Sequence, residues 1–283
     1  TKTSLLNATL INSTAGHGFE SDDIHRESIL HPNSIIVPVS INVSEKIKNV
    51  SGKHFLTAVV AGYEVATRIG SAAGTELLLR GFHPQGTHGT IASAVTAAKL
   101  MTLNKEQTLH AMGIAGSLGA GLMAAQAGAM VKRLHSGRAA EAGVLAAELA
   151  AKKFTGISNI IEADYGGYLS SFSGKNNFTR ATDQLGEVWE CANTGIKPYS
   201  SVTSIHAALD SLKAIMKDNK ILSNISGEYY KNYEINKIVR DNNGVKVYYG
   251  SENEFFTYDK VVLASHADES LKIISDATDQ EKQ

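Results

Sequence analysis

Apolar and small residues recur at helical spacing through the first three quarters of the chain. Phe55 and the Val, Tyr and Ala side chains of residues 56–70 recur on one face, which predicts an amphipathic helix. Alanine-rich segments at 90–100 and 138–154 predict two further helices. Asn104 is a suitable N-cap for another, which ends near Gly116. Because glycine disfavours helices, its frequency here predicts compensating close packing between buried helices.

The last quarter of the chain has shorter, β-branched and aromatic runs that predict strands. Segments 233–240 and 244–249 flank an Asp-Asn-Asn-Gly turn that is typical of a hairpin. Further runs predict a third strand at 255–258, a buried strand at 260–265 and a short helix at 266–275. The pattern therefore predicts a mainly α protein, with a large helical domain over residues 1–215 and a small α/β segment over residues 216–283.

Composition narrows the classes of function. A net charge of −1 gives no electrostatic argument for binding nucleic acid or an anionic membrane. No apolar run reaches the roughly 20 residues of a membrane helix. The single cysteine, Cys191, allows neither an intrachain disulfide nor a thiolate metal cluster, and it fits a reducing, cytoplasmic location. The chain begins without Met or a signal-peptide pattern, as expected of a piece of a longer parent.

Two polar clusters in the first third of the chain carry histidines. Residues 16–25, followed by His31-Pro32, combine acids and imidazoles that suit proton transfer or a metal; the alternative is a solvated, capped loop. Residues 80–90 place glycine and proline just before a helix, whose N-terminus can bind an anion. The alternative for this second cluster is a structural turn with incidental histidines.

Two later clusters carry cations. Lys132, Arg133, His135 and Arg138 gather positive charge between two apolar helices, where they suit a carboxylate ligand; the alternative is a solvated connection. In residues 195–201, Lys197 and Tyr199 are able to bind or protonate a substrate, and His206 begins a helical stretch. We predict no metal site, because no His-Glu-x-x-His spacing occurs and none of the clusters contains cysteine.

Taken in order, the clusters resemble the signature motifs of the MmgE/PrpD family, which includes 2-methylcitrate dehydratases and cis-aconitate decarboxylases. The resemblance covers roughly residues 10–215. It rests on five segments in order. They are the acidic-loop and His-Pro motifs (17–34), a Gly-Tyr-Glu-Val-x-x-Arg motif (62–68), a Phe-His-Pro motif (82–89), a Met-x-Lys-x-Leu-His motif (130–140) and a Lys-Pro-Tyr motif (197–207).

The resemblance implies a large helical domain with a smaller α/β lid, usually in a homodimer, with the site between them. It implies a lyase that acts on a small di- or tricarboxylate, such as a 2-methylcitrate-like substrate, by acid/base chemistry without metal or organic cofactor. The implied catalytic residues are Glu20, His31, His83 and Lys132. The implied substrate-binding residues are Asp23, His25, His135, Lys197 and Tyr199, with Asp22 in support.

Several departures from the family pattern favour alternatives. Ile24 stands where the family usually has Thr, Asn33 replaces Gly, and Ser200-Ser201 replaces Pro and Cys. The family also has more chain on both sides, so the helical domain is expected to be incomplete. A catalytically inactive remnant that binds anions or oligomerises is therefore an alternative, and a helical scaffold without ligand is a simpler one.

The tail has a resemblance of its own. Residues 229–281 resemble an interior segment of flavin-dependent amine-oxidase-like proteins, which leaves a flavin-linked oxidoreductase fragment as a further alternative. We predict no bound flavin, because the Gly-x-Gly-x-x-Gly fingerprint that would bind its phosphates is missing from the chain. An ordinary α/β lid is the other interpretation of the tail.

Overall fold

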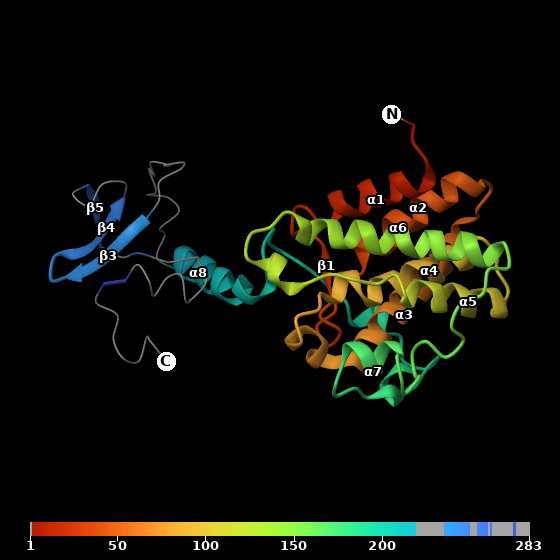
Figure 1. The fold of residues 1–283 in the computed structure, drawn as a ribbon. Coiled ribbons are helices and arrows are strands. Elements are labelled where there is room, and N and C mark those ends of the chain that lie inside the picture. The colour runs from red at the N-terminus through yellow and green to blue at the C-terminus, as the bar shows by residue number, and fades with distance from the viewer. Residues whose placement is uncertain (1, 219–234, 250–253, 260, 262–273, 276–283) are drawn as a thin grey trace. The chain divides into compact units, whose positions relative to one another are not determined.

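A computed structural model describes residues 2–218, 235–249, 254–259, 261 and 274–275 (Figure 1). The chain divides into two compact units, Thr1–Thr203 and Ser204–Gln283, which are described separately. The boundary predicted at residue 215 falls inside the first helix of the second unit.

The first unit is built from helices, which confirms the mainly α prediction (Figure 1). The described helices are α1 (Leu5–Gly16), α2 (Asn33–Ile47), α3 (Gly52–Leu79), α4 (His88–Leu100), α5 (Lys105–Gly116), α6 (Val131–Ala151) and α7 (Tyr168–Phe172). The 3₁₀ turns η1 (Pro84–Gly86) and η2 (Met123–Gln126) lie between these helices, and η3 (Phe178–Ala181) and η4 (Glu190–Asn193) follow α7.

The helices predicted from the sequence occur as α3, α4, α5 and α6. The predicted N-cap of α5 is confirmed: the Asn104 side chain accepts from the backbone N–H of Gln107 at 2.9 Å, and Gln107 returns a bond in a capping box. The prediction for the cationic cluster is corrected. Helix α6 begins at Val131, so Lys132, Arg133 and His135 lie in its first turns rather than in a connection.

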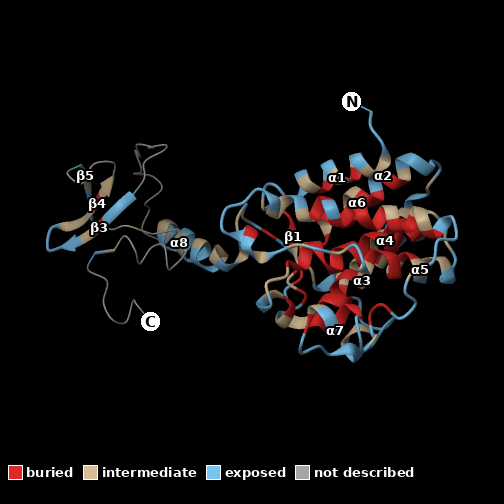
Figure 2. Cartoon of the chain, viewed as in Figure 1, coloured by how far each residue is buried: buried red, intermediate tan, exposed pale blue. Residues whose placement is uncertain are grey.

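Helix α4 lies at the centre of the core, and α2, α3, α5 and α6 pack against it (Figure 2). Small residues allow this close approach, as predicted. A Cβ at Gly143 of α6 would lie 2.4 Å from the Ser93 side chain of α4, and one at Gly62 of α3 would lie 2.1 Å from Thr96 Oγ1. The Ser93 hydroxyl also donates to the carbonyl of Ala140 at 2.8 Å, so α4 and α6 are hydrogen-bonded as well as packed.

One short strand pair positions the polar residues. Strand β1 (Asp23–Ile24) pairs antiparallel with β2 (Gly195–Ile196), so that Asp23 lies opposite Ile196. The backbone N–H of Lys197 also lies 3.4 Å from the carbonyl of Asp22. Two segments more than 170 residues apart in the sequence therefore meet, and the acidic loop after α1 receives a lysine.

The second unit contains α8 (His206–Asp218) and an antiparallel sheet in the order β3 (Ile235–Asp241), β4 (Gly244–Tyr249) and β5 (Phe255–Tyr258). The turn Thr203–Ile205 precedes α8. The hairpin, the third strand and the helix after His206 are confirmed. The predicted strand at 260–265 and helix at 266–275 lie almost wholly outside the described residues. Among the described helices, none is long and apolar enough to cross a membrane.

Candidate active site

A buried dyad of His17 and Asp22 lies at the centre of the polar residues. His17 caps the C-terminus of α1, and its Nδ1 lies 2.6 Å from Asp22 Oδ2, with both side chains almost wholly buried. A carboxylate only accepts hydrogen bonds when ionised, so Nδ1 donates and Nε2 is left to accept. That Nε2 atom is buried and has no hydrogen-bond partner within the described part of the chain. Sequence reasoning did not select His17, although it opens the acidic-loop motif.

Lys197, which directly follows β2, contacts the Asp22 carboxylate of the dyad. Its ammonium is fully buried and donates to Asp22 Oδ1 at 2.6 Å and to Glu20 Oε2 at 2.8 Å. Burial alone would raise the pKa of Asp22, but the hydrogen bond from His17 and the nearby cations hold it well below its usual range. Lys197 therefore has its counter-ions within the protein, which differs from a buried lysine that waits for an external anion.

The Glu20 carboxylate collects three cations. Besides Lys197, Oε1 lies 2.6 Å from Arg133 Nη1 and 3.5 Å from Lys132 Nζ, both in the first turn of α6. Burial alone would raise the pKa of Glu20, but the hydrogen bond from Lys197 and the guanidinium of Arg133 lower it to about 2. Arg133 was not among the predicted site residues, although it belongs to the cationic cluster that sequence reasoning described.

His31 lies beside the dyad with its tautomer fixed. Its Nδ1 is 2.6 Å from the carbonyl of Asp23, so it donates there and Nε2 is free to act as a base. Burial lowers the pKa of His31 to about 4, which keeps the ring neutral near pH 7. The Gln85 side chain of η1 bonds both backbone groups of His31, at 3.1 and 2.9 Å, and so fixes its position.

The loop before α4 brings in a second pair of histidines. His83 Nδ1 lies 2.8 Å from His135 Nδ1 of α6, so the two rings share one proton. Burial, with the neighbouring His135, lowers the pKa of His83 to about 2. The His17 ring lies near both His31 and His83, with its centroid 5.4 Å from that of His31 and 6.4 Å from that of His83. Four imidazoles from four segments are thus gathered into one cluster.

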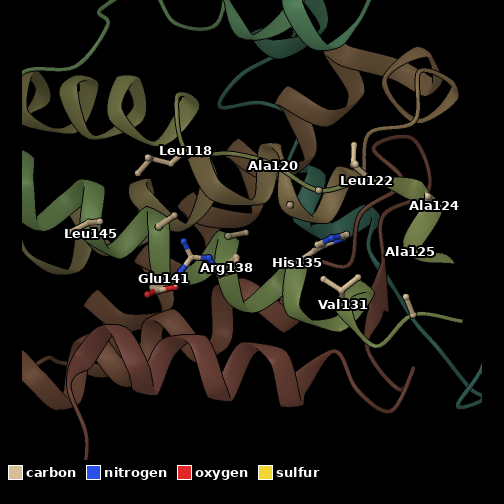
Figure 3. A pocket seen from close by; sticks show the side chains of 15 residues that line it. Leu118, Ala120, Leu122, Ala124, Ala125, Val131, His135, Arg138, Glu141 and Leu145 are labelled. Carbon is tan, nitrogen blue, oxygen red and sulfur yellow. Dashed lines mark hydrogen bonds and ion pairs between the residues drawn. The ribbon is translucent and has the colours of Figure 1, made fainter. Parts of the chain in front are cut away.

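A cavity of about 650 Å³ adjoins this cluster and shares His135 with it (Figure 3). Its walls come from the segment around η2 and from α6, and they include Leu118, Leu122 and Val131, with the Arg138–Glu141 ion pair. Gly121, another wall residue, accepts from the backbone N–H of His83 at 2.9 Å. The cavity therefore gives the histidine cluster an opening with mostly apolar walls.

Three of the predicted substrate-binding residues lie in other settings. Both Asp23 oxygens accept from the protein, Oδ1 from the N–H of Asn33 at 3.0 Å and Oδ2 from the Tyr63 hydroxyl at 2.7 Å, and burial raises the pKa of Asp23 to about 6. His25 turns toward Glu190, with 3.4 Å between Nε2 and Oε2. Tyr199 is half-buried, two residues after Lys197.

The residues that the structure brings together form the site cluster, which includes six of the nine predicted residues together with Asp22. No group of three His, Cys, Asp or Glu among the described residues has the arrangement of a metal site. The site cluster consists of His17, Glu20, Asp22, His31, His83, Lys132, Arg133 and Lys197, with His135 at its edge.

The fold and the site cluster together define a helical domain that carries buried, neutral histidines next to a concentration of cations. The MmgE/PrpD N-terminal domain matches residues 1–181, and the chain belongs to the MmgE/PrpD family. The family resemblance seen in the motifs is therefore confirmed. None of these matches supports the resemblance of residues 229–281 to flavin-dependent proteins.

The chain is also similar to curated relatives from fungi and mammals. It is 34% identical over 224 residues to a cis-aconitate decarboxylase-like protein of Aspergillus oryzae, a match that covers 75% of this chain and 46% of the relative. It is 32% identical over 221 residues to a cis-aconitate decarboxylase of Aspergillus terreus, covering 74% and 45%. The human cis-aconitate decarboxylase is 32% identical over 174 residues, covering 59% and 36%. The chain thus spans less than half the length of these relatives.

Proposed function

We propose that this chain supplies the acid/base and carboxylate-binding half of a lyase that acts on a small tricarboxylate. The observation that carries the proposal is the convergence of three cations on one carboxylate position beside neutral, buried histidines. Family membership and the names of the relatives support it. Those names favour decarboxylation of a cis-aconitate-like substrate, and dehydration of a 2-methylcitrate-like substrate is the second candidate.

The cations bind substrate carboxylates in this proposal. Lys132 and Arg133 are about one-quarter exposed, so solvent and a ligand have access to them, whereas Lys197 is buried and reaches the same position from within. Charge-assisted hydrogen bonds from such groups are roughly twice as strong as neutral ones. The same cations stabilise negative charge that develops next to a carboxylate as a bond to carbon breaks.

His31 and His83 move the proton. Because His31 Nδ1 donates to a carbonyl, its Nε2 lone pair is available to take a proton from carbon or to return one. His83 shares a proton with His135 and is suited to the complementary step. We assign no proton transfer to Glu20, because its carboxylate is engaged by three cations. Asp23 orders α2 and Tyr63 in this proposal.

The test is turnover of cis-aconitate and 2-methylcitrate, followed by NMR of the products. Wild type is compared with His31→Asn and Lys132→Met, and with His110→Asn as a control outside the site cluster. Turnover that both site variants abolish supports the proposal, and equal turnover in all proteins contradicts it. Binding without turnover would favour the inactive anion-binding alternative, which the partial coverage of the relatives keeps open. The homodimer and the cytoplasmic location stay predictions.

A further inference from the structure

The Glu20 carboxylate occupies the position where the cations converge. Its two oxygens lie 2.8 Å from Lys197 Nζ, 2.6 Å from Arg133 Nη1 and 3.5 Å from Lys132 Nζ. The side chain is 16% exposed and lies in the loop between α1 and β1. The protein's own carboxylate is thus bound as an external carboxylate would be.

Two observations indicate that this arrangement is held by the cations rather than by the loop. Glu20 has a backbone φ of +54°, a left-handed conformation that is strained for a residue with a side chain. The contact with Arg133 has the distance of an ion pair, but Arg133 Nη1 makes no aligned hydrogen bond with any residue that the structure describes. Release of Glu20 would therefore relieve strain and free a guanidinium group for a better-aligned partner.

We propose that Glu20 is an internal occupant of the substrate-carboxylate position, which the substrate must displace, and that it thereby selects for polycarboxylates. This inference rests on the proposed function. A monocarboxylate exchanges one carboxylate for another and gains little. A tricarboxylate replaces Glu20 with one group and keeps others to contact the remaining polar atoms of the site cluster, so it alone gains enough to displace Glu20.

The balance of charge fits this role. Three cations, Lys132, Arg133 and Lys197, face two carboxylates, those of Glu20 and Asp22. Asp22 is fully buried and also holds His17, so it stays in place. When Glu20 leaves, a net charge of two positive units remains unpaired at the position that a substrate carboxylate takes.

Isothermal titration of the full 283-residue chain with citrate and with acetate at low salt tests the proposal. Glu20→Gln removes the internal charge, and we expect its Kd for citrate to fall about tenfold, which corresponds to 1.4 kcal/mol. Acetate binding, too weak to measure in wild type, becomes measurable. The matched control is Glu27→Gln, whose carboxylate pairs with Arg180 in a different cluster, and it behaves as wild type.

Unchanged or weaker citrate binding by Glu20→Gln, in a protein that melts cooperatively, overturns the inference. If wild type binds citrate in that case, the proposed function stands. If neither protein binds citrate, the inference and the proposed function are both overturned, because the cations left unpaired in Glu20→Gln should bind an anion. Glu20→Ala repeats the comparison without the Gln amide, which can still bond Lys197. Its Kd for citrate must fall in the same way.

Discussion

Two clusters of charged residues lie in the first unit, each with a buried centre, and they differ in how completely their polar atoms are paired. One is the site cluster. The other, named here the structural cluster, ties α3 to the segments around η3 and η4, and it consists of His25, Glu27, Glu64, Arg68, Arg180 and Glu190.

In the structural cluster, each arginine is matched to acceptors. Arg68 Nε donates to Glu64 at 2.9 Å, and its two terminal nitrogens donate to the carbonyls of Asp183 and Val188, both at 2.7 Å. Arg180 holds Glu27 with two parallel bonds at 2.8 and 2.7 Å. A buried charge is tolerated when its hydrogen bonds are complete, so the role of this cluster is to fix the loops.

In the site cluster, by contrast, the hydrogen bonds of the buried polar atoms are incomplete. His17 Nε2 is buried without a hydrogen-bond partner among the described residues, and the 2.6 Å contact of Arg133 Nη1 with Glu20 lacks the alignment of a hydrogen bond. An unpaired buried polar group costs about 1–3 kcal/mol, so it persists where something other than stability requires it. Two clusters of similar composition in one domain thus differ in their pairing, and this difference supports the site cluster as the candidate active site.

Removal of Arg68 should have the largest effect on stability. Arg68→Ala leaves the buried Glu64 carboxylate uncompensated and two loop carbonyls without donors, and we expect a loss of about 3–5 kcal/mol in the free energy of unfolding. Urea unfolding measures it. The exposed Arg138→Ala should cost less than about 0.5 kcal/mol. Similar losses in the two variants would break the distinction between the clusters.

Removal of His31 should affect turnover rather than stability. The Asn side chain of His31→Asn can still donate to the carbonyl of Asp23 but has no counterpart of Nε2. Lyase turnover should fall by about 10²–10⁴-fold, the range for a general acid or base. Steady-state kinetics and a thermal melt measure the two effects. A variant that unfolds readily yet keeps its specific activity would assign His31 to structure.

The two clusters should lose stability in different ranges of pH. The folded pKa of His31 is about 4, below its unfolded value near 6.5, so its contribution is complete above pH 6.5 and is lost as the pH falls toward 4. That loss is about 3 kcal/mol at 1.4 kcal/mol per pKa unit. Asp23 changes stability in the opposite direction, because its pKa is raised to about 6. Its contribution to stability is complete below its unfolded pKa near 4 and is lost as the pH rises through 6.

The pKa values of Glu27 and Glu190 in the structural cluster are lowered by Arg180, so their contributions are lost only as the pH falls below about 4.5. Urea unfolding of wild type and His31→Asn at pH 7, 5.5 and 4.5 separates the two ranges. The variant should lose less stability than wild type between pH 6.5 and 4.5. Parallel curves for the two proteins would contradict the assignment to His31.

The helices were predictable from the sequence because their signals are local. Alanine periodicity identified α4 and α6, and Asn104 identified the start of α5. Helices α1 and α2 were missed, because α1 has buried Thr9 and Ser13 on its inner face and α2 contains Pro38. The start of α6 was placed too late, because charged residues in its first turns were interpreted as a connection.

The site was partly predictable. Motifs identified His31, His83, Lys132 and Lys197, which the structure brings together. Pairing is not encoded locally: the β1–β2 ladder that sets Lys197 against Asp22 spans more than 170 residues. The different positions of Asp22 and Asp23, which are adjacent in sequence, depend on the side to which each points. One faces His17 and Lys197, whereas the other faces Tyr63.

Thermal unfolding with and without citrate, in wild type and Lys132→Met, tests most directly whether the site cluster binds a polycarboxylate. A ligand at about 100 times its Kd should add roughly 2.7 kcal/mol to the stability of wild type. Lys132→Met should lose most of that gain, and His110→Asn, outside the site cluster, should keep it. Equal stabilisation of all three proteins, or of none, would contradict the account.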